Sequence, residues 1–359
     1  MRKPIPLAVT MGDPGGIGPE VILKTFKQRP LDPHFRYVIF GVPEVFEALK
    51  KKQGLAFSFY PVQRFEKIPF EKQRIYCVDV SEEARRILHQ IKTRRSEKRR
   101  SEARDLHFEI GKISLANAAA AYAALQQACH YAARGKVSAL VTAPVHKMSM
   151  RGIDPHFTGH TEYLAGQSRT KAFAMMFASP RLNVTLVTIH VPLKSVSRLI
   201  TPSVVFQKIR LTDEFLKRYF GIRRPHIAVC ALNPHGRETG REDEEKIRPA
   251  VRLAQKKNIR AVGPLSADRL FFDAYEGRFD AVVSMYHDQG LAPFKMIAFR
   301  EGVNVTLGLP FIRTSPDHGT AFDIAGQGTA DPVSMKSALS LAEQLLKTRL
   351  HASFDGHSD

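Results

Sequence analysis

Three histidines each follow an apolar run of the kind found in buried strands: His190 after 184–189, His235 after 226–232 and His287 after 281–285. Ligands of open α/β sheets bind just outside the carboxyl ends of parallel strands. Three imidazoles can hold one divalent ion and leave a coordination position for a substrate. The pattern therefore predicts a catalytic metal site. The alternative is that each histidine is a turn residue with a single hydrogen bond.

A second set of polar residues has the chemistry of an anion clamp. Lys295, Asn304 and Arg313 follow one another at intervals of nine residues. An ammonium, an amide and a guanidinium beside one cleft would hold phosphate and carboxylate groups. The alternative is that they are solvated surface groups, which fits Arg313 least because its neighbours are apolar.

His160 and Thr161 stand where a loop runs into an expected helix. Threonine is a common helix cap, and the free backbone N–H groups of a helix start favour an anion. The segment fits an anion-binding turn and a plain helix cap equally well.

Two glycine-rich segments are candidates for a cofactor loop. Residues 12–20 follow the first expected strand but lack the glycine offsets of a dinucleotide-binding fingerprint. In residues 317–328, small side chains would let a cofactor approach the backbone, and Asp323 would accept hydrogen bonds from ribose hydroxyls. The alternative for this tail segment is a glycine-rich structural loop.

The elements that must position these residues alternate along the chain. Apolar runs at 7–11, 37–40 and 139–142 precede the three already named, and helical patterns start at Pro19 and near Leu115. Unbroken apolar strands separated by helices indicate parallel sheets covered on both faces, so the class is α/β. The length suits two lobes, which we place at 1–155 with 300–359 and at 156–299 around a cleft.

The composition narrows the partners and the location. The formal net charge of +19 favours anionic partners, and residues 92–100 carry six cations against one anion. No aromatic residues are interleaved with this basic segment (92–104), so a solvated surface is favoured over a nucleic-acid arm. Three sparse cysteines indicate a reducing compartment. No signal peptide or membrane span is expected, which favours the cytoplasm.

Five motifs together resemble the PdxA family of 4-hydroxythreonine-4-phosphate dehydrogenases. They are VTMGDPGGIGPE at 9–20, TAPVHK at 142–147, GHTE at 159–162, NPHGRE at 233–238 and YHDQG at 286–290. The tail segment is also similar to the cofactor loop of isopropylmalate and isocitrate dehydrogenases. The resemblance runs from Leu7 to about Leu346, and the basic segment near 93–104 departs from it by its length.

The resemblance implies a two-domain fold of the isocitrate and isopropylmalate dehydrogenase type, with mostly parallel sheets and an interdomain cleft. It implies a role for each candidate residue. The metal ligands would be His190, His235 and His287. The substrate would be contacted by His160, Thr161, Lys295, Asn304 and Arg313. The cofactor would be contacted by His318, Gly319, Thr320, Asp323 and Gly326. It also implies NAD or NADP, one zinc, magnesium or cobalt ion per site, and a homodimer with the site at the subunit interface.

The expected reaction is the oxidation of 4-phosphohydroxy-L-threonine to a β-keto acid. That acid would lose carbon dioxide to give 3-amino-2-oxopropyl phosphate, in the synthesis of pyridoxal 5'-phosphate (vitamin B6). Lys147 and Asp268 are the candidate general bases. Two other functions fit the same residues: a sister dehydrogenase of threonate or erythronate 4-phosphate, and a non-redox enzyme of the phosphate acyltransferase type.

Overall fold

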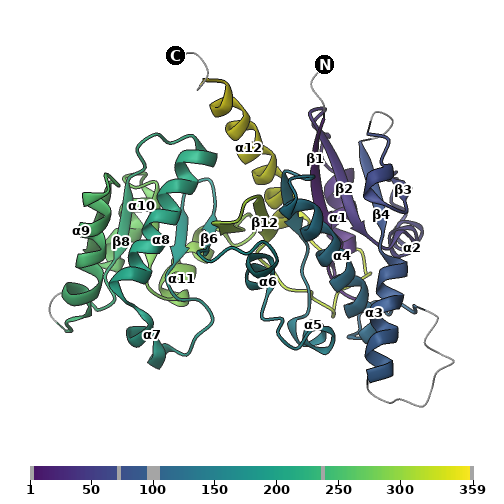
Figure 1. The fold of residues 1–359 in the computed structure, drawn as a ribbon, viewed down its shortest axis with the longest axis horizontal. Helices are drawn as coiled ribbons and strands as arrows, with labels where there is room; N and C mark the ends of the chain where they lie inside the picture. The colour runs from purple at the N-terminus through teal and green to yellow at the C-terminus, as the bar shows by residue number, and fades with distance from the viewer. Residues whose placement is uncertain (1–3, 71–73, 95–105, 236–238, 356–359) are drawn as a thin grey trace. The chain divides into compact units, whose positions relative to one another are not determined.

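The computed structural model describes residues 4–70, 74–94, 106–235 and 239–355 (Figure 1). The chain splits into two compact units, unit 1 with residues 1–169 and 310–343 and unit 2 with residues 170–309 and 344–359. Both units alternate strands with helices, which confirms the expected α/β class. The units differ from the expected lobes at three places: residues 156–169 fall in unit 1, and residues 300–309 and 344–359 fall in unit 2. Within unit 1, the ring of Tyr163 lies 5.6 Å from that of Tyr122.

Unit 1 contains a sheet of six strands in the order β3-β4-β2-β1-β5-β12, and every pair in it is parallel. The strands are β1 (Ile5–Thr10), β2 (Phe35–Gly41), β3 (Tyr60–Val62), β4 (Ile75–Asp79), β5 (Ala139–Thr142) and β12 (Ile312–Pro316). The helices are α1 (Gly18–Lys27), α2 (Pro43–Gln53), α3 (Ser81–Arg94), α4 (Leu115–Ala133), α5 (Lys147–Ile153), α6 (His160–Gln167) and α12 (Val333–Asp355). Residue 343 of α12 is the last one assigned to this unit.

Helix α4 shows why unit 1 packs closely. Ser114 caps its start by accepting a hydrogen bond from the backbone N–H of Asn117. The next residues are mostly alanines, and six of them between 118 and 124 are buried. Small side chains bring the helix axis near β1 and β2, whose own side chains fill the remaining space. The carboxyl ends of β1, β5 and β12 therefore sit on a rigid base.

Unit 2 contains the strand order β11-β6-β7-β10-β8-β9. β6 pairs antiparallel with β11 and β7, whereas β7, β10, β8 and β9 run parallel. The strands are β6 (Ala174–Ala178), β7 (Asn183–Leu186), β8 (Ile227–Cys230), β9 (Ala261–Leu265), β10 (Ala281–Ser284) and β11 (Val303–Leu307). The helices are α7 (Leu193–Leu199), α8 (Pro202–Phe215), α9 (Arg248–Lys256), α10 (Ala267–Tyr275) and α11 (His287–Ala298), with π-helical turns η3 (Leu216–Phe220) and η4 (Asp243–Ile247).

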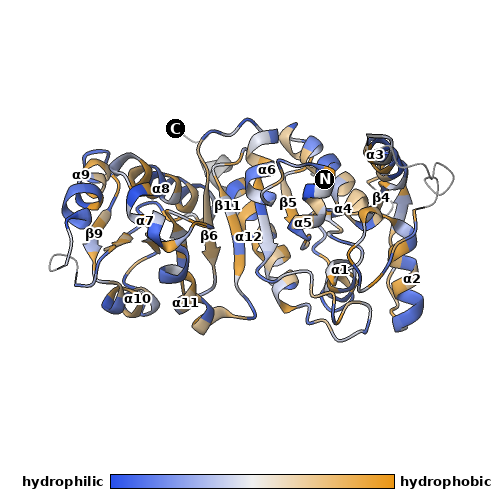
Figure 2. Cartoon of the chain, turned by 90° about the horizontal axis from the view of Figure 1, so that it is seen from below, coloured by the Kyte–Doolittle hydropathy of each residue, from blue (hydrophilic) through white to orange (hydrophobic). Residues whose placement is uncertain are grey.

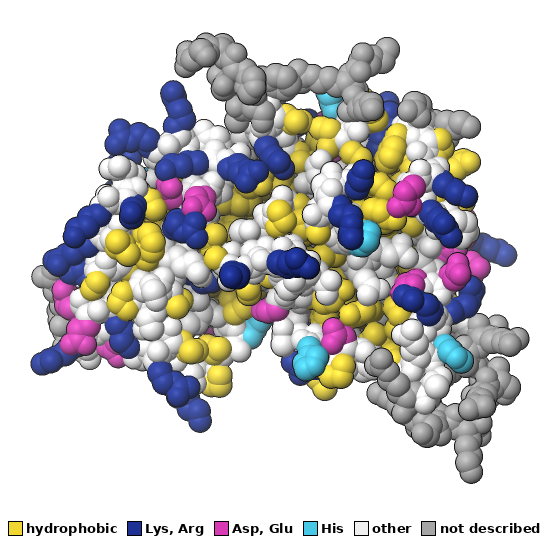
Figure 3. All heavy atoms as spheres, viewed as in Figure 1, with side chains coloured by type: hydrophobic (Ala, Val, Ile, Leu, Met, Phe, Trp, Pro, Cys, Tyr) yellow, Lys and Arg dark blue, Asp and Glu magenta, His cyan; other side chains and the backbone are white. Residues whose placement is uncertain are grey.

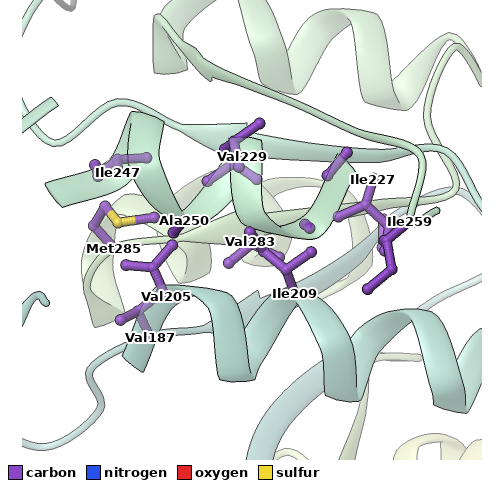
Figure 4. Close-up of a cluster of buried hydrophobic side chains, with 14 of the residues drawn as sticks. Val187, Val205, Ile209, Ile227, Val229, Ile247, Ala250, Ile259, Val283 and Met285 are labelled. Carbon is purple, nitrogen blue, oxygen red and sulfur yellow. The ribbon is translucent and has the colours of Figure 1, made fainter. Parts of the chain in front are cut away.

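Both faces of the parallel sheet in unit 2 are buried. Along β8, Ile227 and Val229 belong to one apolar cluster, whereas Ala228 and Cys230 belong to the cluster on the other face. Figure 4 shows the first cluster, in which buried residues of α8 such as Val205 and Ile209 pack against the strands. This alternation explains why the strands read as unbroken apolar runs in the sequence.

The surface matches the basic composition. Figure 2 shows that the strands are mainly hydrophobic, whereas surface helices such as α2 carry many hydrophilic residues. On the face seen in Figure 3, lysines and arginines are scattered over the surface rather than gathered in one stripe. Most of the basic segment, from residue 95 to 104, lies outside the described residues. Within the described ranges, no helix combines the length and apolarity needed to cross a membrane.

Candidate active site

The three predicted metal ligands follow three neighbouring strands of unit 2. β10 lies between β7 and β8 and is parallel to both, so the carboxyl ends of the three strands share one edge of the sheet. The rings of His190 and His287 have centroids 5.8 Å apart and are tilted by 41°. Two imidazoles on one tetrahedral zinc ion, with Zn–N distances of about 2 Å, would have centroids roughly 5 Å apart. This pair is therefore close to the spacing that a shared ion requires.

The second ring nitrogen of His287 is already engaged. Its Nδ1 lies 2.7 Å from Oδ1 of Asp288, which leaves Nε2 available. Histidines that bind metals commonly donate their other ring N–H to a carboxylate, which fixes the tautomer and the ring orientation. A cavity of about 290 Å³ lies beside the pair and is lined by both histidines, Asp288 and Tyr286. The two histidines therefore border an open space at the carboxyl edge of the parallel strands.

His235 stands on a loop after β8 with a left-handed backbone, φ 56°. Asp243, which is fully buried, holds the start of this loop by accepting hydrogen bonds from the backbone N–H groups of Leu232 at 2.6 Å and Asn233 at 3.2 Å. The next three residues, 236–238, lie outside the described part of the chain. Among the residues that are described, no three His, Cys, Asp or Glu side chains are grouped closely enough to hold an ion.

Two side chains that the sequence reasoning missed tie these strand ends together. Gln289 accepts from the backbone N–H of Met285 and donates to the carbonyl of Ala231, both at 2.7 Å, which joins the end of β10 to the end of β8. The hydroxyl of Thr188 donates to the carbonyl of Met285 at 2.8 Å, which joins the end of β7 to β10. Gln289 stands in the HDQG motif, so its place beside His287 was the available signal.

Three further predicted residues belong to unit 2. Asp268 begins α10 and is exposed; a hydrogen bond from Ser266, another from a backbone N–H and the nearby His235 lower the pKa of its carboxyl. Lys295 lies on α11 with its ammonium 5.2 Å from the ring centre of Phe299. Asn304 lies in β11 opposite Phe177 of β6. Asp268 is thus the candidate base on the histidine side.

Unit 1 holds the rest of the predicted substrate contacts, around a buried guanidinium. Arg313 in β12 is 3% exposed. Its Nη2 and Nε donate to the hydroxyl of Thr142, at the end of β5, at 2.8 and 3.2 Å. Burial lowers the pKa of Arg313 to about 10, against the opposing influence of Glu162. A buried guanidinium has the donor geometry that suits a phosphate or carboxylate group.

His160, Thr161 and Lys147 lie in the same unit. Burial, with the positive charges of Arg313 and Lys147, holds the pKa of His160 well below its usual range, so the ring is neutral at physiological pH. Nε2 of His160 is buried and has no hydrogen-bond partner within the described ranges. Thr161 is buried in the first turn of α6, and Lys147 is exposed at the start of α5. The structure thus places His160 within the electrostatic influence of both Arg313 and Lys147.

The predicted cofactor loop also belongs to unit 1, and the first glycine-rich motif supports it. The backbone N–H of Ile17 donates to the carbonyl of Thr320 at 2.8 Å. A Cβ at Gly16 would lie 2.7 Å from that same carbonyl oxygen, so this approach requires glycine. His318, Gly319, Asp323 and Gly326 lie on the rest of the loop, where Gly319 and Asp323 are exposed.

Glu20 was not predicted as a site residue, yet it anchors the far end of this loop. Its buried carboxylate accepts from the backbone N–H groups of Ala330 at 3.0 Å and Gly328 at 3.3 Å, and it pairs with Lys24 at 2.8 Å. Burial alone would raise its pKa, but the bonds from Lys24, Gln53 and Ala330 outweigh that effect and lower it. The carboxylate is therefore charged at neutral pH and holds the loop.

Asp13 is a second unpredicted acid of the first motif. It is 1% exposed, and its Oδ1 accepts from the backbone N–H of Gly15 at 2.9 Å. Burial raises the pKa of its carboxyl to about 6, although the bond from Gly15 works in the opposite direction. Its own N–H donates to the carbonyl of Pro144 at 2.9 Å, which ties the loop to the segment that precedes Lys147.

Comparison with known proteins gives consistent results. The family described as pyridoxal phosphate biosynthetic protein PdxA matches residues 38–342. A 4-hydroxythreonine-4-phosphate dehydrogenase of Geobacter metallireducens is 40% identical, over 96% of this chain and 96% of the relative. A protein of Oceanobacillus iheyensis, named provisionally as a D-threonate 4-phosphate dehydrogenase, is also 40% identical, over 97% of this chain and 99% of its own length.

A solved structure has the same fold along nearly the whole chain. The 4-hydroxythreonine-4-phosphate dehydrogenase of Klebsiella pneumoniae is 32% identical and superposes with a TM-score of 0.79, covering 95% of this chain and 99% of the other. The fold and the site define a two-unit α/β enzyme of the dehydrogenase class. The chain belongs to the PdxA family. Membership in a family of dehydrogenases sets aside the phosphate acyltransferase alternative.

Proposed function

We propose that the chain is an NAD(P)-dependent, divalent-metal-dependent dehydrogenase of 4-phosphohydroxy-L-threonine. The observation that carries the proposal is the His190 and His287 pair at parallel strand ends, with Asp288 on the second ring nitrogen of His287. Imidazoles at neighbouring strand ends, one of them oriented by a carboxylate on its second ring nitrogen, are typical of catalytic metal sites.

In this proposal His190, His235 and His287 hold a zinc, magnesium or cobalt ion. When bound, such an ion lowers the pKa of the substrate hydroxyl and stabilises the negative charge that decarboxylation leaves. The loop with His318, Gly319, Thr320, Asp323 and Gly326 binds the nicotinamide cofactor, which accepts the hydride. Exposed Asp323 has the chemistry to accept from ribose hydroxyls.

In this proposal, polar residues bind and orient the anionic ends of the substrate. Arg313 supplies a desolvated guanidinium for a phosphate or carboxylate, and neutral His160 offers a ring nitrogen that needs a partner. Thr161, Lys295 and Asn304 complete the substrate contacts. Fixing both ends of a small substrate places its hydroxyl carbon for hydride transfer.

Oxidation removes a hydride from the hydroxyl carbon and a proton from its oxygen. Lys147 or Asp268 takes that proton. The β-keto acid then loses carbon dioxide, and protonation of the remaining enol gives 3-amino-2-oxopropyl phosphate. An exposed aspartate is ionised at neutral pH, so Asp268 is in the form that accepts a proton. The proposed role of this reaction is a step in vitamin B6 synthesis in the cytoplasm, in keeping with three buried, unpaired cysteines.

We further propose that the enzyme is a homodimer with the site at the subunit interface. Large apolar side chains are exposed on α10, on α11 and directly after α11, namely Phe272 at 55%, Met296 at 89% and Phe299 at 72% exposure. Neighbouring exposed apolar residues of this size are typical of association surfaces. Analytical ultracentrifugation tests this proposal, because Phe299→Ser combined with Met296→Ser should shift a dimer to the monomer.

A second candidate substrate is D-threonate 4-phosphate. The relative from Oceanobacillus iheyensis is named for this substrate. Its sequence is 40% identical to this chain, as is that of the relative from Geobacter metallireducens. The two substrates share the phosphate and the secondary hydroxyl and differ in an amino group, so the histidines and Arg313 serve either one. Parallel turnover assays with both compounds separate the two functions.

The metal assignment is tested by replacing His235 with Ala. We expect loss of turnover and loss of the bound ion, measured by metal analysis after desalting, with an unchanged circular dichroism spectrum. His34→Ala is the matched control, because His34 is an exposed histidine that pairs with nearby Asp32 and is not one of the predicted site residues. Full turnover of the His235→Ala enzyme in chelator-treated buffer would contradict the assignment.

A further inference from the structure

The first turn of α11 carries both His287 and Gln289, and it lies close against the sheet of unit 2. A Cβ at Gly290 would meet the hydroxyl of Ser284 in β10 and would lie 2.8 Å from a methyl group of Val184 in β7. Glycine is therefore required for this approach of helix to sheet. The turn that presents His287 is thus fixed against two of the strands that precede the predicted metal ligands.

Gln289 lies just beyond the point where the pairing of β10 with β8 ends. The last pair of the register is Val283 opposite Val229. Met285 and Ala231 each lie two residues further along their strands. The side-chain amide of Gln289 accepts from the N–H of Met285 and donates to the carbonyl of Ala231, both at 2.7 Å. An amide offers a donor and an acceptor, as a peptide unit does, so Gln289 adds one rung to the ladder between the two strands.

Both ends of this rung are also held from the other side. The carbonyl of Met285 accepts from the hydroxyl of Thr188 at 2.8 Å and from its N–H at 3.1 Å. The N–H of Ala231 donates to the carbonyl of Leu265 in β9 at 2.7 Å. Because these contacts fix both ends, the length of the Gln289 side chain sets the separation between the ends of β10 and β8.

The two strand ends lead to two predicted metal ligands. His287 stands two positions after Met285. His235 stands four positions after Ala231, on the loop whose start is held by the buried carboxylate of Asp243. A shared ion tolerates little change in the spacing of its ligands, since each bond to an imidazole nitrogen is about 2 Å long. The separation of the strand ends therefore bears directly on the two histidines.

We propose that Gln289 is a positioning residue, which sets the spacing between His287 and His235 and thereby the affinity of the site for a divalent ion. This inference rests on the proposed function, because it requires the two histidines to share an ion. Gln289 acts through the backbone of the two strands, to which both polar atoms of its amide are bonded.

The test is titration of the metal-free full chain with Co²⁺, followed by visible absorption, which reports both the affinity and the coordination geometry. Gln289→Met keeps the length of the side chain and removes both hydrogen bonds. Gln289→Asn keeps the amide but is one methylene shorter, so it does not span the gap. Gln255→Met is the matched control, because the amide of Gln255 donates to the carbonyl of Ala261 at 2.9 Å, at the start of β9 in the same unit. Urea titration of each metal-free chain measures its stability.

We expect both Gln289 variants to bind Co²⁺ at least about tenfold more weakly and with an altered absorption band, whereas Gln255→Met binds it like the unchanged chain. If Gln289→Met fails to fold, Gln289→Asn decides the question. Lower stability with the same affinity and absorption would overturn the proposal, because it would make Gln289 a purely structural residue. Equal weakening in the control would overturn it as well. An unchanged chain that binds no Co²⁺ would instead contradict the metal site of the proposed function, so the two failures are distinguishable.

Discussion

Replacing Thr142 with Val removes the hydroxyl that holds the guanidinium of Arg313. The hydroxyl accepts from Nη2 at 2.8 Å and from Nε at 3.2 Å, and both residues are buried. Valine has nearly the same shape, so the change deletes the acceptor without opening a cavity. The guanidinium then keeps its charge in a desolvated place while losing the group that orients it.

The size of the effect follows from these contacts. A hydrogen bond to a charged group contributes about 1.5–3 kcal/mol, and a second, longer bond to the same oxygen adds less. We take about 2–3 kcal/mol for the pair. If half or more of this appears as weaker binding of the anionic substrate, kcat/KM falls roughly tenfold to a hundredfold, because about 1.4 kcal/mol corresponds to a factor of ten. The loss should fall mainly on KM, since Thr142 itself does not touch the reacting hydroxyl in the proposed mechanism.

The assay is steady-state formation of reduced nicotinamide with Thr142→Val, Thr142→Ser and the unchanged enzyme. Serine keeps the accepting oxygen, so Thr142→Ser should retain KM within a few-fold. An unaltered KM in Thr142→Val would refute the reasoning, because it would mean that Arg313 needs no orientation or does not bind the substrate. A uniform loss of kcat with both variants would also refute it.

Three other changes test separate parts of the account. Asp13→Asn should raise the free energy of unfolding, measured by urea titration, by about 3 kcal/mol at pH 7.5 and by almost nothing near pH 3.5. Burial raises the pKa of this carboxyl from 3.8 to about 6, and each pKa unit costs the folded state about 1.4 kcal/mol once the group is ionised. Equal effects at both pH values would contradict this. In the unchanged protein, the free energy of unfolding should fall as the pH drops below 6.5, because the imidazole of His160 binds a proton in the unfolded chain and not in the folded one. His160→Gln should make this dependence on pH shallower. An unchanged dependence would show that other groups cause the fall. Glu20→Gln should raise the KM for the cofactor several-fold, because it weakens the bond that holds the loop at Ala330. The KM for the substrate should change little. A larger effect on the KM for the substrate than on that for the cofactor would show that this loop does not bind the cofactor.

Much of the fold could be predicted because the parallel strands are buried on both faces. The runs at 7–11, 37–40, 139–142 and 281–285 correspond to β1, β2, β5 and β10 for that reason. The positions of His190, His235 and His287 after strands followed directly. Edge strands gave weaker signals: β3 has only three residues, two of them exposed, and leaves no apolar run to detect.

The long-range contacts of the site could not be predicted from local pattern. Thr142 and Arg313 are 171 positions apart, and Glu20 reaches a backbone N–H 310 positions away. Such pairs depend on which strands become neighbours, and no spacing rule in one sequence reports that order. The unit boundary has the same origin, because α6 packs against α4 of unit 1, where Tyr163 contacts Tyr122.

The central claim is tested most directly by the ratio of kcat/KM for 4-phosphohydroxy-L-threonine to that for D-threonate 4-phosphate, measured with NAD and NADP and repeated after chelation. The account predicts a ratio well above one, release of carbon dioxide in step with reduced cofactor, and loss of both signals when the metal is removed. A ratio below one would move the substrate to the sugar acid. Turnover that survives chelation and His287→Ala would contradict the metal chemistry itself.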